Sequence, residues 1–137
     1  MENKIKHLEF IQQTINRVAG NSFLLKGWSV TLIVGIFALS AKDSNTHYIL
    51  LAYFPTFLFW FLDGYFLQQE RLYRSLYDEV RKKEENQIDF SMNAQIFVEK
   101  DKRNTWLEST FCSKTVAASY AVLITILFVV MVFTINK

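Results

Sequence analysis

The chain contains few residues that cross-link, stiffen or break a protein backbone. Its 137 residues include one cysteine, one proline, four glycines and two histidines. The single Cys112 cannot form an intramolecular disulfide, which argues against an oxidised, secreted scaffold. The four glycines are scattered and form no phosphate-binding loop. The first twenty residues also lack the short apolar core and small-residue cleavage site of a signal peptide.

The chain also has no large excess of positive or negative residues, whereas apolar residues are abundant. The net charge of +2 gives no reason to expect a nucleic-acid partner. Apolar residues make up 51% of the chain, and three long runs of them cover residues 23–41, 48–67 and 115–135. At ~1.5 Å per residue each run is roughly 28–32 Å long, close to the ~30 Å hydrocarbon core of a bilayer. The sequence therefore predicts an all-α integral membrane protein, built as one membrane domain over residues 1–137.

The distribution of lysine and arginine predicts how the chain is oriented. All but two of the fifteen basic residues lie before or at the start of the first run, or between the second and third runs; the exceptions are Lys42 and Lys137. Basic residues favour the cytoplasmic side of a membrane, so we expect the N-terminus inside and the C-terminus outside. The three tryptophans, Trp28, Trp60 and Trp106, lie near the cytoplasmic ends of the runs, where amphipathic rings favour the interface.

One basic and one acidic residue lie within the first two runs, where an ionised group is costly. A hairpin between these runs has its midpoint between Ser44 and Asn45, and reflection through that point places Lys26 at the depth of Asp63. We therefore predict an ion pair between the two spans, about one turn inside the cytoplasmic boundary. It either only fixes the register of the hairpin, which is the more common role, or moves when the protein opens or binds a ligand. Gly27 and Gly64 follow the two charges and are expected to let the two backbones approach closely.

Two amphipathic segments are predicted on the cytoplasmic side. Residues 1–20 form one helix, and residues 68–85 continue the second span as another. The first could lie on the membrane surface or pack on the second, within one chain or between subunits. Residues 86–114 form a loop in which 96–98 is a short strand or a docked segment, followed by a short helix that starts at Thr105. The predicted face for interaction with a partner comprises Leu72, Leu76 and Val80.

Small residues recur at four-residue spacing on two spans and predict close helix packing, because small side chains let backbones approach in a bilayer. Three helices have limited surface to offer one another, so we expect a homo-oligomer. The residues of the two stripes are Gly27, Thr31 and Gly35 on the first span, and Ala117, Ala121 and Thr125 on the third.

No catalytic, cofactor-binding or metal-binding residue is predicted. His7 and His47 fall on opposite sides of the bilayer and cannot share a metal. A small intramembrane enzyme would need several carboxylates at the interface; the candidates are Asp63 and Glu70, and Lys26 is expected to occupy the first. We therefore expect no enzyme and no cofactor.

The strings NSFLLKGW and LDGYFLQQERLYRSLYD resemble a bacterial family of small inner-membrane proteins that has no assigned activity. The resemblance covers roughly the first 90 residues and implies the bacterial cytoplasmic membrane. By architecture alone the chain is also similar to the membrane effectors of anti-phage systems, which assemble and permeabilise the host membrane.

Three functional hypotheses follow. The leading one is an oligomeric, signal-responsive pore or membrane-disrupting effector of bacterial defence. Its partners are the lipid bilayer, other copies of the chain, and a cytoplasmic protein or small signalling ligand. The alternative is a non-conducting membrane anchor that presents its amphipathic helices to a partner protein. A small intramembrane enzyme is the remote alternative.

Overall fold

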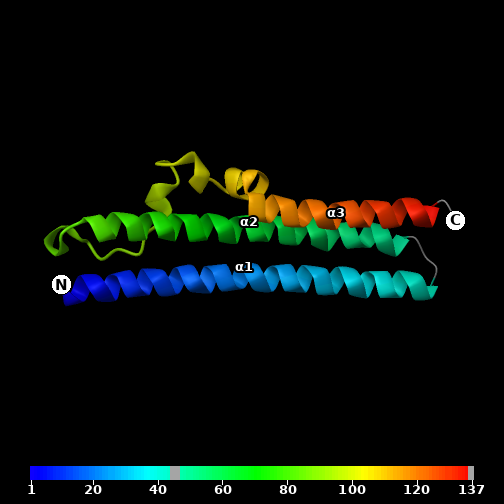
Figure 1. The fold of residues 1–137 in the computed structure, drawn as a ribbon, viewed down its shortest axis with the longest axis horizontal. Helices are drawn as coiled ribbons and strands as arrows, with labels where there is room; N and C mark the ends of the chain where they lie inside the picture. The colour runs from blue at the N-terminus through cyan, green and yellow to red at the C-terminus, as the bar shows by residue number, and fades with distance from the viewer. Residues whose placement is uncertain (44–46, 136–137) are drawn as a thin grey trace.

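The computed structural model describes residues 1–43 and 47–135, which form three long helices linked by short helical turns (Figure 1). The described residues contain no strand, and each long helix includes a stretch long and apolar enough to cross a membrane. The long helices are α1 (Glu2–Asp43), α2 (His47–Lys82) and α3 (Lys114–Ile135). The turns are η1 (Glu85–Gln87), η2 (Gln95–Phe97), η3 (Lys102–Asn104) and the π-helical η4 (Glu108–Cys112).

The N-terminal amphipathic segment and the first apolar run are one continuous helix, α1, and not the two segments predicted. No proline interrupts residues 2–43, and a lone Gly20 costs only about 1 kcal/mol in a helix interior. The side chains of Ile11, Ile15 and Val18 are buried. The face that they form continues one turn later at Ser22, which contacts α2. A single long partner helix therefore keeps α1 in register on both sides of the expected break.

The second helix also continues without a break from its apolar run into the predicted extension, and it ends at Lys82 rather than at residue 85. The ammonium of Lys4 donates hydrogen bonds to the carbonyls of Arg81 (3.1 Å) and Lys83 (2.6 Å). A cation is favourable at a helix C-terminus, where the last carbonyls lack helical partners. The start of α1 thus caps the end of α2.

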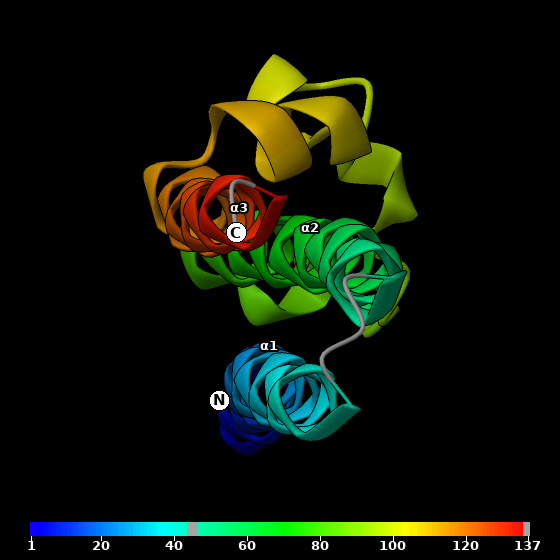
Figure 2. The same cartoon turned by 90° about the vertical axis from the view of Figure 1, so that its right-hand side faces the viewer.

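The three helices lie in a row with α2 in the middle, as the end view shows (Figure 2). α1 packs on one side of α2 along almost its whole length. α3 packs on another side, and it covers only the part of α2 nearest the α1–α2 connection. The segment between α2 and α3 first runs back along the seam between α1 and α2, and its later part then lies on the same side of α2 as α3 (Figure 1). α1 and α3 both run antiparallel to α2, so they run in the same direction (Figure 1).

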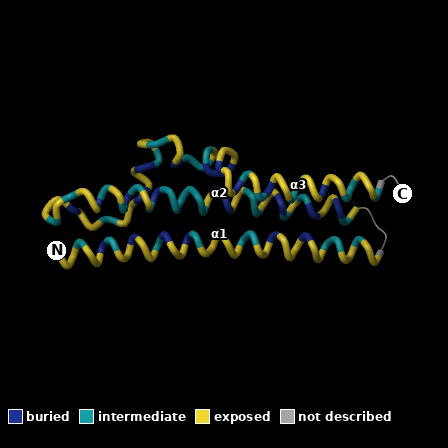
Figure 3. The backbone as a smooth tube through the Cα atoms, viewed as in Figure 1, coloured by how far each residue is buried: buried dark blue, intermediate teal, exposed yellow. Residues whose placement is uncertain are grey.

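The molecule divides along its length into two halves of different composition. Buried positions recur along the helices in both halves (Figure 3). We call residues 1–22 and 68–113 the polar half, and residues 23–67 and 114–135 the apolar half. The polar half holds a buried cluster made by α1, α2 and residues 88–97. The apolar half holds a smaller buried cluster, Ile33, Ala52 and Leu127, one residue from each long helix. Many of its remaining large apolar side chains are exposed, as expected of helices that face lipid.

Candidate functional site

The best-defined polar site joins α1 to α2 at the end of the apolar half. Nζ of Lys26 lies 2.5 Å from Oδ2 of Asp63, which is the contact that the hairpin reflection predicts. Asp63 is fully buried, whereas about one-third of the Lys26 side chain is exposed. Ser22 completes the site, because its hydroxyl donates to Oδ1 of Asp63 and accepts a hydrogen bond of 3.0 Å from Lys26. Oδ1 is therefore hydrogen-bonded, whereas Oδ2 is in contact with the Lys26 ammonium but accepts no well-aligned hydrogen bond from the described residues.

Ser22 was not predicted from the sequence, although its position offered a signal. It lies one helical turn before Lys26, so both side chains reach the same neighbour on α2. A hydroxyl one turn from a buried charge supplies the second hydrogen bond that a carboxylate needs when it leaves water.

The third wall of this site is the π-helical turn η4. A Cβ placed on Gly64 would lie 2.0 Å from the hydroxyl oxygen of Thr110 and 2.9 Å from its Cα. Gly64 thus permits a close approach, but to Thr110 and not to α1 as predicted. The prediction for Gly27 is wrong, because that residue is exposed and no atom lies within 4 Å of a Cβ built on it. The reason is that Gly27 lies on the opposite side of α1 from the residues that contact α2.

Two indole groups fix η4 and the residues before it to the second helix. Trp60 donates a hydrogen bond of 3.0 Å to the carbonyl of Thr110, and Trp106 donates one of 3.3 Å to the carbonyl of Phe61. A carbonyl inside a regular helix has only one lone pair free, so Phe61 accepts a bond that adds to its helical one. These contacts hold η4 against the part of α2 that contains Asp63 and Gly64.

Further buried polar groups lie deeper between the helices. Ser29 of α1 and Tyr120 of α3 are fully buried, and neither hydroxyl has a hydrogen-bond partner among the described residues. The Tyr120 ring stacks on Trp60 at 6.2 Å between centroids. A buried unpaired hydroxyl costs about 1–3 kcal/mol. The interior of the apolar half is thus more polar than its periphery, and these hydroxyls could bind water if the helices separated.

The small-residue stripes face away from the rest of the chain. Gly27, Thr31 and Gly35 are all exposed, and a Cβ on Gly35, as on Gly27, would meet no atom within 4 Å. On α3, Ala117 is half-buried, whereas Ala121 and Thr125 are exposed. Neither stripe is used for packing inside one chain.

The predicted interaction face on α2 is covered by the chain itself, so it is not a free surface. Leu72, Leu76 and Val80 are 0%, 5% and 4% exposed. They pack in the polar half with two isoleucines of α1 and with three residues of the segment that follows α2. The amphipathic part of α1 thus packs on α2 within one chain, and residues 96–98 form a docked turn and no strand. The five covering residues are Ile11, Ile15, Ile88, Ala94 and Phe97.

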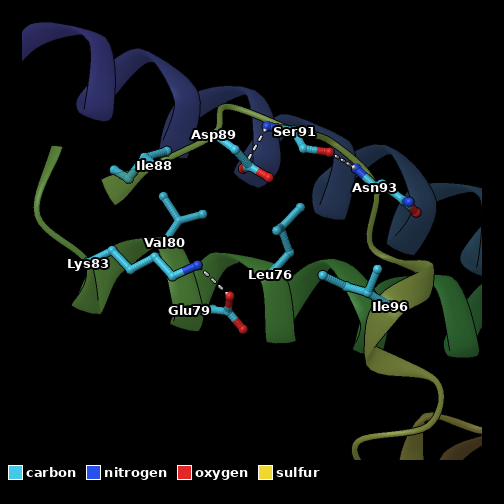
Figure 4. Close-up of a pocket in the computed structure, with 9 residues that line it drawn as sticks. All are labelled: Leu76, Glu79, Val80, Lys83, Ile88, Asp89, Ser91, Asn93 and Ile96. Atoms are coloured by element: carbon cyan, nitrogen blue, oxygen red, sulfur yellow. Dashed lines mark hydrogen bonds and ion pairs between the residues drawn. The ribbon is translucent and has the colours of Figure 1, made fainter. Parts of the chain in front are cut away.

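A cavity of about 150 Å³ remains between α2 and the segment that covers it (Figure 4). Its floor is apolar, and its rim carries Glu79, Lys83 and Asp89. The Lys83 ammonium lies 2.7 Å from Glu79, and hydrogen bonds from Lys83 and Lys100 hold the pKa of the Glu79 carboxyl below its usual value. The volume is enough for a few water molecules or a small chemical group. The apolar side chains of the floor are Leu76, Val80, Ile88 and Ile96.

No metal centre is visible in the part of the chain that the structure describes, where no three His, Cys, Asp or Glu side chains gather. Glu70, the second candidate carboxylate, is paired with Arg74 at 2.8 Å on the surface of α2. The chain matches no family model, no curated protein and no solved structure.

Proposed function

We propose that this chain is a homo-oligomeric membrane protein whose spans form or gate a narrow pore. Its polar half would receive the opening signal in the cytoplasm of a bacterial cell. The observation that supports this best is the row of three helices with an outward-facing stripe of small residues on each outer helix. In lipid, helices associate through such close-packing faces, because no hydrophobic effect drives them together.

The two stripes match in direction and in depth. α1 and α3 run the same way, and Ile33 and Leu127 meet in one buried cluster, so these two residues lie at similar depth. Thr31 precedes Ile33 by two residues and Thr125 precedes Leu127 by two, which places the two threonines level with each other. Each threonine hydroxyl bonds to the carbonyl four residues before it, Gly27 and Ala121 respectively, and not to another helix.

This arrangement favours a head-to-tail assembly. α1 of one copy would pack in parallel on α3 of the next, through two different surfaces, and such heterologous contacts form a ring when the rotation between copies closes. A ring of four or more copies would have enough helices to surround a narrow path. Opening would then require movement between helices within or between copies.

The ion pair is placed to hold one state of such an assembly. Sliding or rotation of α1 on α2 would separate Lys26 from Asp63 and leave a buried carboxylate without its cation. Breaking a buried pair costs on the order of 3–5 kcal/mol, which is enough to bias a two-state equilibrium strongly. A signal that moved α1 in the polar half would reach this contact, because α1 is one continuous helix.

The other hypotheses have less support. A membrane anchor that presents Leu72, Leu76 and Val80 requires a free face, and this face is covered. An enzyme that uses Asp63 requires a carboxylate available to a metal or substrate, and both of its oxygens are engaged. A role in anti-phage defence rests on likeness of architecture alone.

Cysteine cross-linking tests the head-to-tail interface. In a Cys112→Ser background, we expect Thr31→Cys combined with Thr125→Cys to give an oxidation ladder of dimers, trimers and larger species. Each single variant should give no ladder, because a chain with one cysteine can join only one other chain. The matched control is Leu32→Cys with Ile126→Cys, which has the same spacing on neighbouring exposed positions.

Native mass spectrometry in nanodiscs then gives the number of copies, and planar bilayers give the conductance. A closed ring of at least four copies with measurable conductance would support the proposal. A monomer or dimer, or a control pair that cross-links as well as the stripe pair, would overturn the head-to-tail pore.

A further inference from the structure

Residues 103–110, which lead into α3, are hydrogen-bonded to α2 at successive positions along that helix. Nη1 of Arg71 donates to the carbonyl of Arg103 at 2.7 Å, and Nε1 of Trp60 donates to the carbonyl of Thr110 at 3.0 Å. The carbonyl of Asn104 accepts a hydrogen bond of 3.0 Å from Gln68, and Thr110 abuts Gly64. These two α2 residues are four positions apart, which is about 6 Å along the helix. Residues 103–110 therefore run from the polar half towards the apolar half.

The exposed side chains of this segment are sorted by polarity along that path. At the upper level lie Lys102 and Arg103, both exposed, with 78% of the Arg103 side chain accessible. At the lower level lie Leu107 and Phe111, which are 62% and 47% exposed. The Phe111 ring lies 5.3 Å from the Trp60 ring, which fixes its depth at an apolar part of α2.

A lipid leaflet fits this order of side chains better than water or a protein partner. Large exposed apolar groups are expected at the edge of the hydrocarbon, and cations a short distance above it, at the phosphates. The Lys and Arg side chains are long enough to reach down towards that level. The surface is also continuous with α3, which begins at Lys114, two residues after η4. The indoles of Trp60 and Trp106 lie at the same level, as in interfacial belts.

We propose that residues 102–112 form a binding site for anionic phospholipid at the inner leaflet. Leu107 and Phe111 enter the edge of the hydrocarbon, and Lys102 and Arg103 bind the headgroup phosphates. The inference rests on the membrane insertion that the proposed function includes, but not on oligomerisation or conduction. The Arg103 guanidinium forms an exposed ion pair with Asp101, with Nε 3.4 Å from Oδ2. Surface pairs of this kind are weak, so a headgroup phosphate can compete with the Asp101 carboxylate for Arg103.

The native Cys112 provides a reporter, because it is exposed and is the only cysteine. A hydrogen bond with the Glu108 carboxylate raises the pKa of its thiol, so labelling with a small thiol-reactive fluorophore is carried out at alkaline pH. The labelled full-length protein is placed in vesicles with equal amounts of phosphatidylcholine and phosphatidylglycerol. The quenching bromines are carried by the acyl chains of one lipid or of the other.

We expect brominated lipid to quench the label at Cys112, and about twofold or more strongly when the bromines are on phosphatidylglycerol. The double variant Lys102→Gln/Arg103→Gln should remove that preference while quenching persists. Its matched control, Arg81→Gln/Lys82→Gln, removes the same charge from exposed residues at the far end of α2 and should keep the preference. Equal quenching by both lipids in the native chain, or the same loss in both double variants, would overturn the proposal.

Two further label positions separate this proposal from membrane insertion itself. In a Cys112→Ser background, Val122→Cys on α3 should be quenched by either lipid, and Glu99→Cys in the polar half by neither. If the label at position 122 is quenched and the label at Cys112, like that at position 99, is not, the proposed lipid site is wrong although α3 is inserted in the membrane. If Val122 is not quenched, insertion of α3 fails, and the lipid site fails with it.

Discussion

The polar and apolar halves use the same two helices, α1 and α2, but bury them in different ways. In the polar half the seam between them is sealed by a third layer, residues 88–97, so that Leu72 and Ile11 are fully buried. In the apolar half α3 supplies the third layer, and only Ile33, Ala52 and Leu127 form a buried apolar cluster. Many of the large apolar residues that remain, such as Leu50 and Phe133, are exposed.

The proposed insertion of the apolar half into a membrane accounts for this difference. Water drives apolar side chains together, so the connecting segment of the polar half covers the apolar seam between α1 and α2. Lipid gives no such drive, and the contacts that specify packing are then polar groups, close backbones and aromatic stacking. Lys26 with Asp63, Gly64 with Thr110 and Tyr120 with Trp60 are contacts of these kinds.

Breaking the ion pair is the change expected to have the largest effect on the apolar half. We expect Lys26→Met to lower the free energy of unfolding in detergent by on the order of 3–5 kcal/mol, because it strands a fully buried carboxylate. Asp63→Leu should cost less, since the Lys26 side chain is partly exposed and can turn towards water. The double variant should recover much of the loss, as folded yield and thermal unfolding would show. A double variant no more stable than either single one would contradict a coupled pair.

Two leucines of α2 test the difference between the halves directly. Leu72 is 0% exposed and Leu50 is 57% exposed, and both lie on the same helix. Leu72→Ala should cost about 2–5 kcal/mol, because it leaves a cavity in the sealed cluster. Leu50→Ala should change the stability by about 0.5 kcal/mol or less. Denaturant unfolding in detergent measures both losses. Equal losses would show that Leu50 is packed in a core that the single chain lacks.

Two glycines offer a smaller and more local comparison. Gly64→Ala should destabilise the protein by about 1–3 kcal/mol, because its Cβ would force the backbone of Thr110 away. Gly27→Ala meets no atom and should raise helix stability by up to about 1 kcal/mol while it weakens self-association. Thermal unfolding gives the first effect, and the mass distribution in nanodiscs gives the second. If Gly27→Ala left the oligomer unchanged, the α1 stripe would not be its interface.

Sequence patterns predicted the parts of this fold that depend on one helix or on helices paired over a short connection. The three runs and the extension of α2 follow from composition and spacing. The contact of Lys26 with Asp63 follows from a hairpin with a near-symmetric connection. The cover over Leu72 could not be predicted, because residues 84–101 have no helical or strand period and dock through a few side chains such as Phe97. The partner of Gly64 lies far along the chain, and no local pattern indicates a contact with Thr110.

The smallest expected effect concerns the rim of the cavity in the polar half. Hydrogen bonds from Lys83 and Lys100 lower the pKa of Glu79 from its usual 4.5. A carboxyl with a lowered pKa in the folded state stabilises that state above about pH 4.5, and the contribution is lost as the pH falls through the lower folded value. Because Glu79 is about one-third exposed, its contacts contribute to the free energy of unfolding as a surface pair does, below about 1 kcal/mol. The protection factors of residues 88–97 should therefore fall modestly below pH 4.5, which is an acceleration relative to the intrinsic exchange rate at each pH, and Glu79→Gln should remove that acceleration. The matched variant Glu70→Gln breaks a surface pair with Arg74 away from the cavity and should leave the acceleration in place. If both variants removed it, the cover would respond to net charge and not to the contact of Glu79 with its two lysines.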